Sequence, residues 1–388
     1  MIMKKQKTLA VLGSTGSIGR QTLEIAERKA LKVDFIALGS DVKAGEEQIR
    51  KFSPRFCFVS DEAASKALTV SVADTSTKVL SGNDGISEGL SKTRADVCIN
   101  GIGGFDGLTP TLDAIKFCKR LGLANKESLV AAGDIVMKAA SESGCELIPV
   151  DSEHSTIFRC LSGEKRENVR RLILTCSGGA FYGMSKKELE NVQVSDAVLH
   201  PNWNMGKVIT VNCATLINKG LEIIEAAHLF GMPSEKIDVV IHRESIIHSL
   251  VEFNDMSVKA LLSVPDMRIP IQYAIEYPEC TETACAPLDL IKTGKLTFSS
   301  PDTDTFPLLD LARNAMERGG VIPCVMNAAN EMAVDAFLAG KLKFCEISGI
   351  VTEITDKYEN IQSPTLDDII AANEDARMKT AALLSKRF

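Results

Sequence analysis

The amino-acid sequence predicts an α/β protein in three parts: a Rossmann-like domain with a parallel sheet at residues 1–150, an α+β domain at 151–295 and a helical domain at 296–388. Short apolar runs alternate with helical patterns as far as Pro149, and their spacing then becomes irregular. From Thr305 onward the chain is mostly helical. A chain of 388 residues is also too long for one ordinary core.

In the first part, apolar runs that end at glycine or polar residues predict buried strands at 8–12, 33–38, 57–59, 97–100 and 121–124. Helical patterns lie between them, for example at about 20–29, 111–120 and 126–143. Strands that alternate with helices of this length indicate a parallel sheet covered on both faces.

In the second part, strands are expected at 172–175 and 239–241, with a helix from about Cys213 to Phe230 between them. In the third part, helices are expected at 306–318, 325–339 and 366–385. Gly319, Gly320 and Gly340 punctuate this last pattern.

The composition is that of a globular protein without a nucleic-acid or membrane partner. The net charge is -7, so the chain lacks the excess of basic residues that binds the phosphate backbone of nucleic acids. The 11 cysteines include no CxxC pair, and no apolar run is long enough to span a bilayer. The basic start Met1–Lys5 runs into the first strand and lacks a cleavage site, so we expect no signal peptide and a cytoplasmic location.

A glycine-rich turn, Gly13–Gly19, joins the first strand to the first helix. Glycines at this place allow a pyrophosphate to approach the backbone, and the helix N-terminus offers N–H groups to the anion. The spacing is GxxGxxG instead of the common GxGxxG, and a tight turn without a ligand is the alternative. The surrounding strand–helix units favour a dinucleotide site.

The second strand ends at Gly39-Ser40-Asp41, where dinucleotide-binding proteins distinguish NADPH from NADH. Ser40 could donate to a 2′-phosphate, whereas Asp41 would repel one if it pointed inward. These residues alone leave the choice open.

Two carboxylates, Asp151 and Glu153, follow the apolar strand that ends at Val150. Strand alternation would place them on one face, where they could share Mg²⁺ or Mn²⁺. The alternative is a solvated loop with a helix N-cap near Ser155. Their position at the carboxyl end of the sheet favours the metal site.

A third carboxylate, Glu222, lies one helical turn from Asn218 and Lys219, so the three can face one site. A surface Lys–Glu pair is the alternative. Gly220 within this helix costs about 1 kcal/mol relative to alanine, which indicates a close approach of a ligand or of packing atoms.

Two polar segments suit an anionic ligand. Thr175–Gly179 ends a strand with small residues, and His200–Gly206 carries the single tryptophan, Trp203, between Pro and Gly. The second segment is either a loop that closes over a substrate or a surface loop anchored by a buried indole. The remaining histidines of this region, at 228, 242 and 248, are interpreted as core or surface residues.

These segments, in this order, resemble the 1-deoxy-D-xylulose 5-phosphate reductoisomerase family over almost the whole chain. The matching stretches are GSTGSIG (13–19), FSPR (52–55), LANKESLV (123–130), PVDSEH (149–154), SGG (177–179), HPNWNMG (200–206), NKGLE (218–222), VIHRESIIHS (240–249), PDMRIPI (265–271) and NAANE (327–331).

The resemblance implies a site for each group of ligands. The implied metal ligands are Asp151, Glu153 and Glu222, one divalent ion per chain. The implied substrate contacts are Lys126, Ser152, Glu153, Ser177, His200, Cys213, Asn218, Lys219 and Glu222. The implied cofactor contacts are Thr15, Gly16, Ser17, Ile18, Gly39, Ser40, Asp41, Asn125, Glu127 and Gly206, with a mobile lid near 199–208 that includes His200 and Trp203.

The resemblance also implies the chemistry, which belongs to non-mevalonate isoprenoid biosynthesis. A metal held by three carboxylates acts as Lewis acid in the rearrangement of 1-deoxy-D-xylulose 5-phosphate, and NADPH reduces the resulting aldehyde to 2-C-methyl-D-erythritol 4-phosphate. Catalytic roles fall to Lys126, Asp151, Glu153, Glu222 and His200. The family precedent for assembly is a homodimer.

Two departures and two competing hypotheses accompany the resemblance. A basic residue is common in the family near Ser40 and is absent here. Cys213 stands where the family usually has serine, and a thiol is a weaker donor to phosphate. A sugar-phosphate dehydrogenase without isomerisation would not need three carboxylates. A nucleotide-sensing regulator would be expected to have lost the carboxylates or Lys126, and all are present. We therefore favour the reductoisomerase.

Overall fold

The computed structural model describes residues 7–203 and 205–386, so the expectations for Met1–Lys5 and for Asn204 of the predicted lid lie outside the described residues. The chain divides into two compact units. The first contains the chain as far as Ser128 together with 136–155 and 267–285, and the second contains 129–135, 156–266 and 286–388. The predicted three-domain boundaries stay a prediction.

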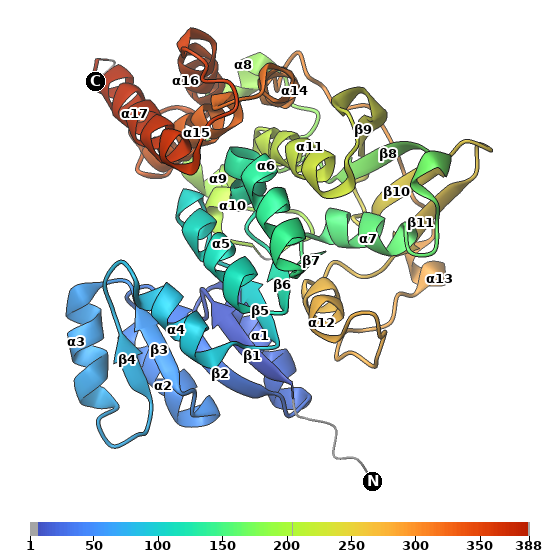
Figure 1. The fold of residues 1–388 in the computed structure, drawn as a ribbon. Coiled ribbons are helices and arrows are strands. Elements are labelled where there is room, and N and C mark those ends of the chain that lie inside the picture. Colours follow the sequence, from blue (N-terminus) through green and yellow to red (C-terminus); the bar gives the residue numbers. More distant parts are fainter. Residues whose placement is uncertain (1–6, 204, 387–388) are drawn as a thin grey trace. The chain divides into compact units, whose positions relative to one another are not determined.

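The first unit is built on a parallel sheet of seven strands within the described residues, in the order β4-β3-β2-β1-β5-β6-β7 (Figure 1). The order reverses at β1, and ligands of such sheets bind where the order reverses. The strands are β1 (Thr8–Leu12), β2 (Lys32–Leu38), β3 (Phe56–Val59), β4 (Lys78–Leu80), β5 (Val97–Asn100), β6 (Arg120–Leu123) and β7 (Glu146–Pro149).

Helices connect these strands, as parallel pairing requires. They are α1 (Ser17–Arg28), α2 (Val42–Phe52), α3 (Glu62–Ser71), α4 (Gly85–Thr93), α5 (Leu108–Phe117) and α6 (Lys126–Ser143), the last of which has its middle in the second unit. A distant segment adds α12 (Arg268–Glu276), which packs against α1 and β6. Arg120 fixes α12 by donating to the carbonyl of Ile275 at 3.2 Å.

The second unit carries a mixed sheet of four strands in its described residues, in the order β11-β10-β8-β9. β8 (Val169–Cys176) pairs in parallel with β9 (Ile237–Ile241). β10 (Ile247–Phe253) pairs antiparallel with both β8 and β11 (Val258–Leu262). The other helices between residues 152 and 293 are α7 (Ser152–Cys160), α8 (Lys186–Leu189), α9 (Val194–Ala197), α10 (Lys207–Ala214), α11 (Ile217–Phe230) and α13 (Leu290–Thr293), of which α11 packs against β8 and β9.

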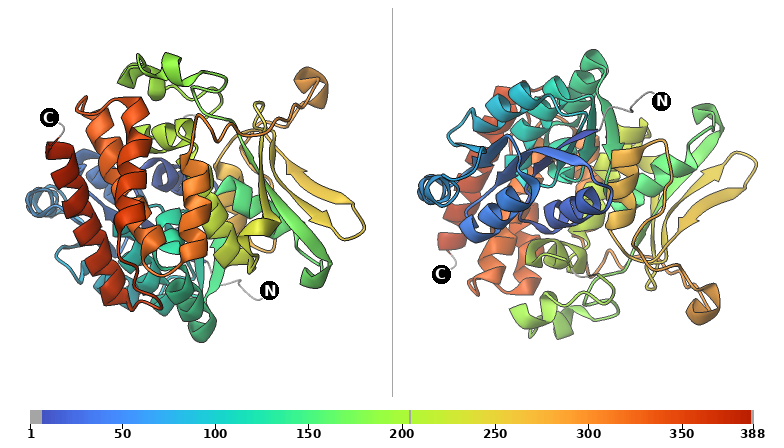
Figure 2. Two further views of the ribbon diagram at one scale, coloured as in Figure 1. Left: turned by 90° about the horizontal axis from the view of Figure 1, so that it is seen from above. Right: turned by 90° about the horizontal axis from the view of Figure 1, so that it is seen from below.

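Four helices complete the second unit: α14 (Leu308–Arg318), α15 (Ile322–Leu338), α16 (Phe344–Lys357) and α17 (Leu366–Ser385). In the left view of Figure 2 these orange and red helices lie side by side. α15 is buried over most of its length and packs against α16, α17, α14 and α10. Among the described residues, no helix has the length and apolar character needed to cross a membrane.

The predicted α/β class is confirmed, and two local predictions are wrong. The helix expected from Cys213 to Phe230 is two helices, because Leu216 takes a left-handed φ of 62° between α10 and α11. Asp151 and Glu153 do not alternate along a strand, because α7 begins at Ser152 and takes Glu153 into its first turn.

Candidate functional site

The glycine turn after β1 has the close backbone contacts expected of a pyrophosphate-binding turn. Gly13 has a φ of +74°, and a Cβ there would lie 2.7 Å from the carbonyl oxygen of Gly101. A Cβ on Gly19 would lie only 2.2 Å from the carbonyl oxygen of Gly13. Gly16 precedes α1 without a side-chain cap, so the N–H groups of the first helical turn keep their capacity for an anion.

Asp41 of the predicted cofactor site has a structural role. Its carboxylate accepts a hydrogen bond from the Ala44 N–H at 3.0 Å and caps α2. The Arg20 guanidinium lies 4.0 Å away. The neighbouring Gly39 and Ser40 are exposed, so the end of β2 presents a cation and a hydroxyl together with the carboxylate.

The start of α6 holds three predicted residues in a fixed arrangement. Asn125 caps the helix by accepting from the Ser128 N–H, and its amide donates to the Glu127 carboxylate at 3.0 Å. Lys126 is buried, and its ammonium lies 2.7 Å from the Asp151 carboxylate. Burying two charges is costly unless they are paired, so this contact places an ammonium and a carboxylate at the ends of β6 and β7.

Asp151 is held in its ionised form. Burial alone would raise the pKa of its carboxyl, but the charges of Lys126 and His154 hold that pKa well below the usual range. Its carboxylate also accepts from the Glu153 N–H at 3.2 Å, and the Ser152 hydroxyl lies 2.5 Å from the Glu153 carboxylate. The segment therefore presents two oriented carboxylates at the start of α7.

Glu222 is buried on α11 beside both residues that the helical spacing predicts. The Asn218 amide donates to one carboxylate oxygen at 2.5 Å, and the Lys219 ammonium contacts the other. Gly220 faces away from this group, since a Cβ there would lie 2.4 Å from Ala312 of α14. Close helix packing therefore explains the glycine without a ligand.

Ser177 and His200 meet in the second unit. The Ser177 Oγ lies 2.7 Å from the His200 Nε2, and the N–H groups of Asn202 and Trp203 donate to the His200 Nδ1 at 3.2 and 3.0 Å. Burial and the nearby charge of Arg243 lower the pKa of His200 to about 4. The imidazole is therefore neutral at pH 7, with its proton on Nε2.

The Ser177–Gly179 turn lies against the end of α10. A Cβ on Gly179, whose φ is +71°, would lie 2.6 Å from the carbonyl oxygen of Cys213. Cys213 is therefore close to the turn that carries Ser177. Gly206 immediately precedes α10, and Trp203 packs edge-on against His248 with ring centroids 5.8 Å apart.

The other histidines agree with the interpretation as core or surface residues. His242 is fully buried, stacks on Phe298 and accepts hydrogen bonds from the N–H groups of Ile246 and Ile247. Burial lowers the pKa of His248 to about 4.

Arg243 is a further residue of this region that the sequence did not reveal. Arg243 donates to the carbonyls of both Ser177 and Gly179, yet the sequence shows only a charged residue in a loop. Its place in the VIHRESIIHS stretch was the available signal.

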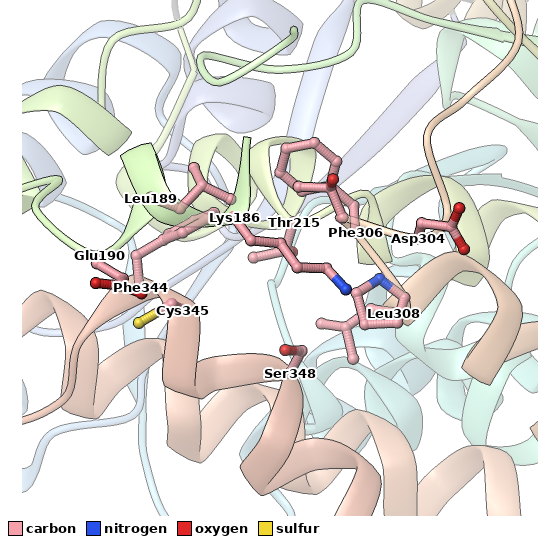
Figure 3. Close-up of a pocket in the computed structure, with 12 residues that line it drawn as sticks. Lys186, Leu189, Glu190, Thr215, Asp304, Phe306, Leu308, Phe344, Cys345 and Ser348 are labelled. Carbon is pink, nitrogen blue, oxygen red and sulfur yellow. The ribbon is translucent and has the colours of Figure 1, made fainter. Parts of the chain in front are cut away.

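A pocket of about 340 Å³ lies in the second unit at the starts of α14 and α16 (Figure 3). Figure 3 shows the Lys186 side chain extending across it, with Cys345 and Ser348 on one wall. Of the predicted site residues, none is among the described residues that line this pocket.

Three sequence models of known domains match successive parts of the chain. They are 1-deoxy-D-xylulose 5-phosphate reductoisomerase at 9–133, its C-terminal domain at 147–230 and a further DXP reductoisomerase C-terminal domain at 262–379. The reductoisomerase of Caldanaerobacter subterraneus subsp. tengcongensis is 49% identical over 96% of this chain and 97% of the relative. The chain belongs to the 1-deoxy-D-xylulose 5-phosphate reductoisomerase family.

Other members of the reductoisomerase family agree. The reductoisomerase of Geobacillus kaustophilus is 46% identical over 98% of this chain and 100% of the relative. The solved reductoisomerase of Zymomonas mobilis, in complex with NADPH, is 40% identical with a TM-score of 0.91, over 98% of this chain and 99% of that chain. Another solved reductoisomerase, in complex with NADPH, fosmidomycin and magnesium, is 38% identical with a TM-score of 0.93, over 98% of both chains.

Proposed function

We propose that this chain converts 1-deoxy-D-xylulose 5-phosphate into 2-C-methyl-D-erythritol 4-phosphate, with NADPH and one divalent cation. One observation carries the proposal. In a chain 49% identical to one named reductoisomerase, Lys126 and all three expected carboxylates are present, and each is held by specific partners.

The cation would be held by Asp151, Glu153 and Glu222, the ligands that the family resemblance implies. The residues fit a hard ion, because all three offer carboxylate oxygens and Asp151 is kept ionised. When bound, Mg²⁺ or Mn²⁺ supplies Lewis-acid polarisation of the substrate's ketone and hydroxyl oxygens. Ser152 orients the Glu153 carboxylate, and Asn218 with Lys219 orients that of Glu222.

The cofactor would lie against the turn after β1. The turn fits a pyrophosphate, since Gly13 and Gly19 leave no room for a Cβ and α1 starts without a side-chain cap. When bound, NADPH supplies the hydride that reduces the aldehyde. The remaining proposed contacts are Thr15, Ser17, Ile18, Gly39, Ser40, Asp41, Asn125, Glu127 and Gly206, with Asp41 acting mainly as the cap of α2.

The substrate's phosphate would be bound by Ser177, Asn218 and Lys219, with Cys213 as a weaker donor. The neutral His200 donates to Ser177 and so leaves the serine proton available to a phosphate oxygen. Lys126 would stabilise charge on the reacting oxygens from its position beside Asp151. The segment near 199–208 would exclude water as a lid.

We further infer, from the family precedent and the sequence alone, a homodimer in the reduced cytoplasm. Sedimentation of the purified chain at micromolar concentration tests the dimer. A monomer at that concentration would contradict it.

The activity is tested by mixing the protein with 1-deoxy-D-xylulose 5-phosphate, Mn²⁺ and NADPH. We expect consumption of NADPH that stops when the metal is chelated, and a branched tetrol phosphate as product. Reduction of the substrate without rearrangement would support a simple dehydrogenase. Stoichiometric binding of NADPH without turnover would support a regulator.

Matched variants locate the site. Glu222→Gln removes one ligand charge at nearly constant volume, so we expect at least a 100-fold loss of kcat at fixed Mn²⁺. Glu374→Gln, on the exposed face of α17, is the control and should retain full activity. Equal activity of the two variants would exclude Glu222 from the metal site.

A further inference from the structure

Arg243 lies between β9 and β10 and contacts two separate loops of the second unit. We propose that Arg243 is a positioning residue: it fastens the Ser177–Gly179 turn to the His200–Trp203 segment and so sets the affinity for the phosphate group of the substrate. The inference rests on the proposed function, and it deepens the description of that site.

The side chain of Arg243 holds the first loop. Its Nη1 donates to the carbonyl oxygens of Ser177 at 2.5 Å and Gly179 at 2.9 Å. In a trans peptide the C=O and N–H groups point in opposite directions, so these contacts turn the N–H groups of Gly178 and Ala180 away from the guanidinium. The ring of Tyr182, 4.9 Å from the guanidinium carbon, supports the same side chain by a cation–π contact.

The main chain of Arg243 holds the second loop. Its carbonyl oxygen accepts a hydrogen bond from the Asn202 side-chain amide. The same amide donates to the Ser245 hydroxyl at 2.9 Å. The predicted lid is therefore tied, through Asn202, to the residue whose side chain holds the Ser177–Gly179 turn.

A third contact, a hydrogen bond between His200 and Ser177, joins the two loops directly. The His200 Nδ1 accepts from two backbone N–H groups, which leaves the ring proton on Nε2 to be donated to the Ser177 Oγ. The Gly179 N–H also donates to that Oγ, at 3.2 Å. Both acceptor positions of the serine oxygen are thus used, and its hydroxyl proton is directed to an outside acceptor such as a phosphate oxygen.

These linked hydrogen bonds connect Arg243 to the orientation of the proposed phosphate-binding groups. Losing its side chain frees the carbonyls of Ser177 and Gly179, so the serine and the N–H groups of the turn lose their common orientation. Hydrogen bonds to charged groups contribute about 1.5–3 kcal/mol each, which corresponds to a factor of roughly 10 to 150. The cost should fall on the binding of the phosphorylated substrate and not on the binding of NADPH.

The first test compares Arg243→Gln and Arg243→Lys with a matched control. Arg170→Gln removes a half-exposed arginine that pairs with Glu252 on the same sheet, and it should change no kinetic constant by more than twofold. We expect Arg243→Gln to raise KM for 1-deoxy-D-xylulose 5-phosphate at least tenfold, with KM for NADPH within twofold. Arg243→Lys should be intermediate, because an ammonium keeps the charge but loses the stacking of the planar guanidinium on the Tyr182 ring.

The second test asks whether the two loops are joined. Asn202→Ala should raise the same KM on its own, and the double variant Arg243→Gln/Asn202→Ala should exceed Arg243→Gln by less than twofold. Independent, multiplying effects would overturn the proposal, as would an unchanged substrate KM in Arg243→Gln.

Folding is checked by the denaturant midpoint of each variant. If Arg243→Gln does not fold, Arg243→Lys and Asn202→Ala decide the question by the same KM criterion. Failure of this inference differs from failure of the proposed function. In the first case the wild-type chain turns over the substrate and the variants match it, whereas in the second the wild-type chain itself is inactive.

Discussion

Two glycine turns, one in each unit, are held in place by different kinds of contact. The turn after β1 and the turn after β8 both end a strand with glycines at positive φ, such as Gly13 at +74° and Gly179 at +71°. The first continues directly into the 12-residue helix α1. The second has no helix behind it, and its carbonyls and hydroxyl are held instead by Arg243 and His200.

The difference shows what each turn depends on. A helix N-terminus gives an anion site from one continuous segment, because the dipole and the N–H groups come with the helix. The turn after β8 needs partners that lie 23 and 66 positions away in the chain. The first site should therefore depend on backbone space, and the second on side chains that orient it.

The largest effect is expected for Gly19→Ala. Its Cβ would lie 2.2 Å from the Gly13 carbonyl oxygen and 2.5 Å from the Ser14 Cα, so the turn itself must open. We expect KM for NADPH to rise at least 100-fold and the free energy of unfolding to fall by about 3 kcal/mol. Steady-state kinetics and urea denaturation measure both.

Gly349→Ala is the matched control, because nothing lies within 4 Å of its added Cβ. It should leave both KM values unchanged. A normal KM for NADPH in a folded Gly19→Ala protein would remove the turn after β1 from the cofactor site and break the comparison.

Gly179→Ala should have the next largest effect, on the other ligand. The substitution strains a φ of +71° and pushes a Cβ to 2.6 Å from the Cys213 carbonyl oxygen. We expect KM for 1-deoxy-D-xylulose 5-phosphate to rise about 10–50-fold, while KM for NADPH stays within threefold. A rise in KM for NADPH of the same size would show that the two turns do not serve separate ligands.

The same contrast explains how far the sequence could be interpreted. The α/β class, the ends of most strands and the contacts of Asn218 and Lys219 with Glu222 follow from periodicity within one segment. Leu216, which separates α10 from α11, carries no signal for its left-handed φ of 62°. Strands β10 and β11 and helix α16 were missed, since tertiary pairing and packing outweigh their local patterns.

The candidate site also contains residues that local sequence identifies and residues that depend on distant contacts. Carboxylates that follow a strand end could be named from the sequence, but their placement at the start of α7 could not, because Ser152 gives no unambiguous helix start. Arg243 was missed because its role depends on carbonyl groups far away in the chain. Only a resemblance or a structure could supply such long-range contacts.

A pH experiment tests the contact of His200 with the second turn. Its pKa of about 4 in the folded protein lies below the ordinary value of 6.5, so between these limits the unfolded chain binds the proton and the folded chain does not. The contribution of His200 to stability is therefore complete above pH 6.5 and is lost as the pH falls toward 4. From pH 6.5 to 5 the loss should stay below about 2 kcal/mol, because solvent screens the partly exposed imidazole.

Urea denaturation of the wild type and His200→Gln at both pH values isolates this contribution. The variant lacks the titrating ring, so its free energy of unfolding should fall less steeply. Parallel pH dependence of the two proteins would mean that His200 is not held neutral between Ser177 and the backbone N–H groups.

The smallest effect is expected for Cys213→Ser, which tests a donor beside the second turn. The Cys213 carbonyl lies under Gly179, so a hydroxyl on this residue is close to the proposed phosphate contacts. A hydroxyl is a stronger donor than a thiol and is smaller, so the gain should be a single modest hydrogen bond of about 0.5–1 kcal/mol. We expect KM for 1-deoxy-D-xylulose 5-phosphate to fall about threefold, with KM for NADPH unchanged.

Cys345→Ser, at an exposed position on α16, is the control. An unchanged substrate KM in Cys213→Ser would place the phosphate out of reach of residue 213 and leave its binding to Ser177, Asn218 and Lys219.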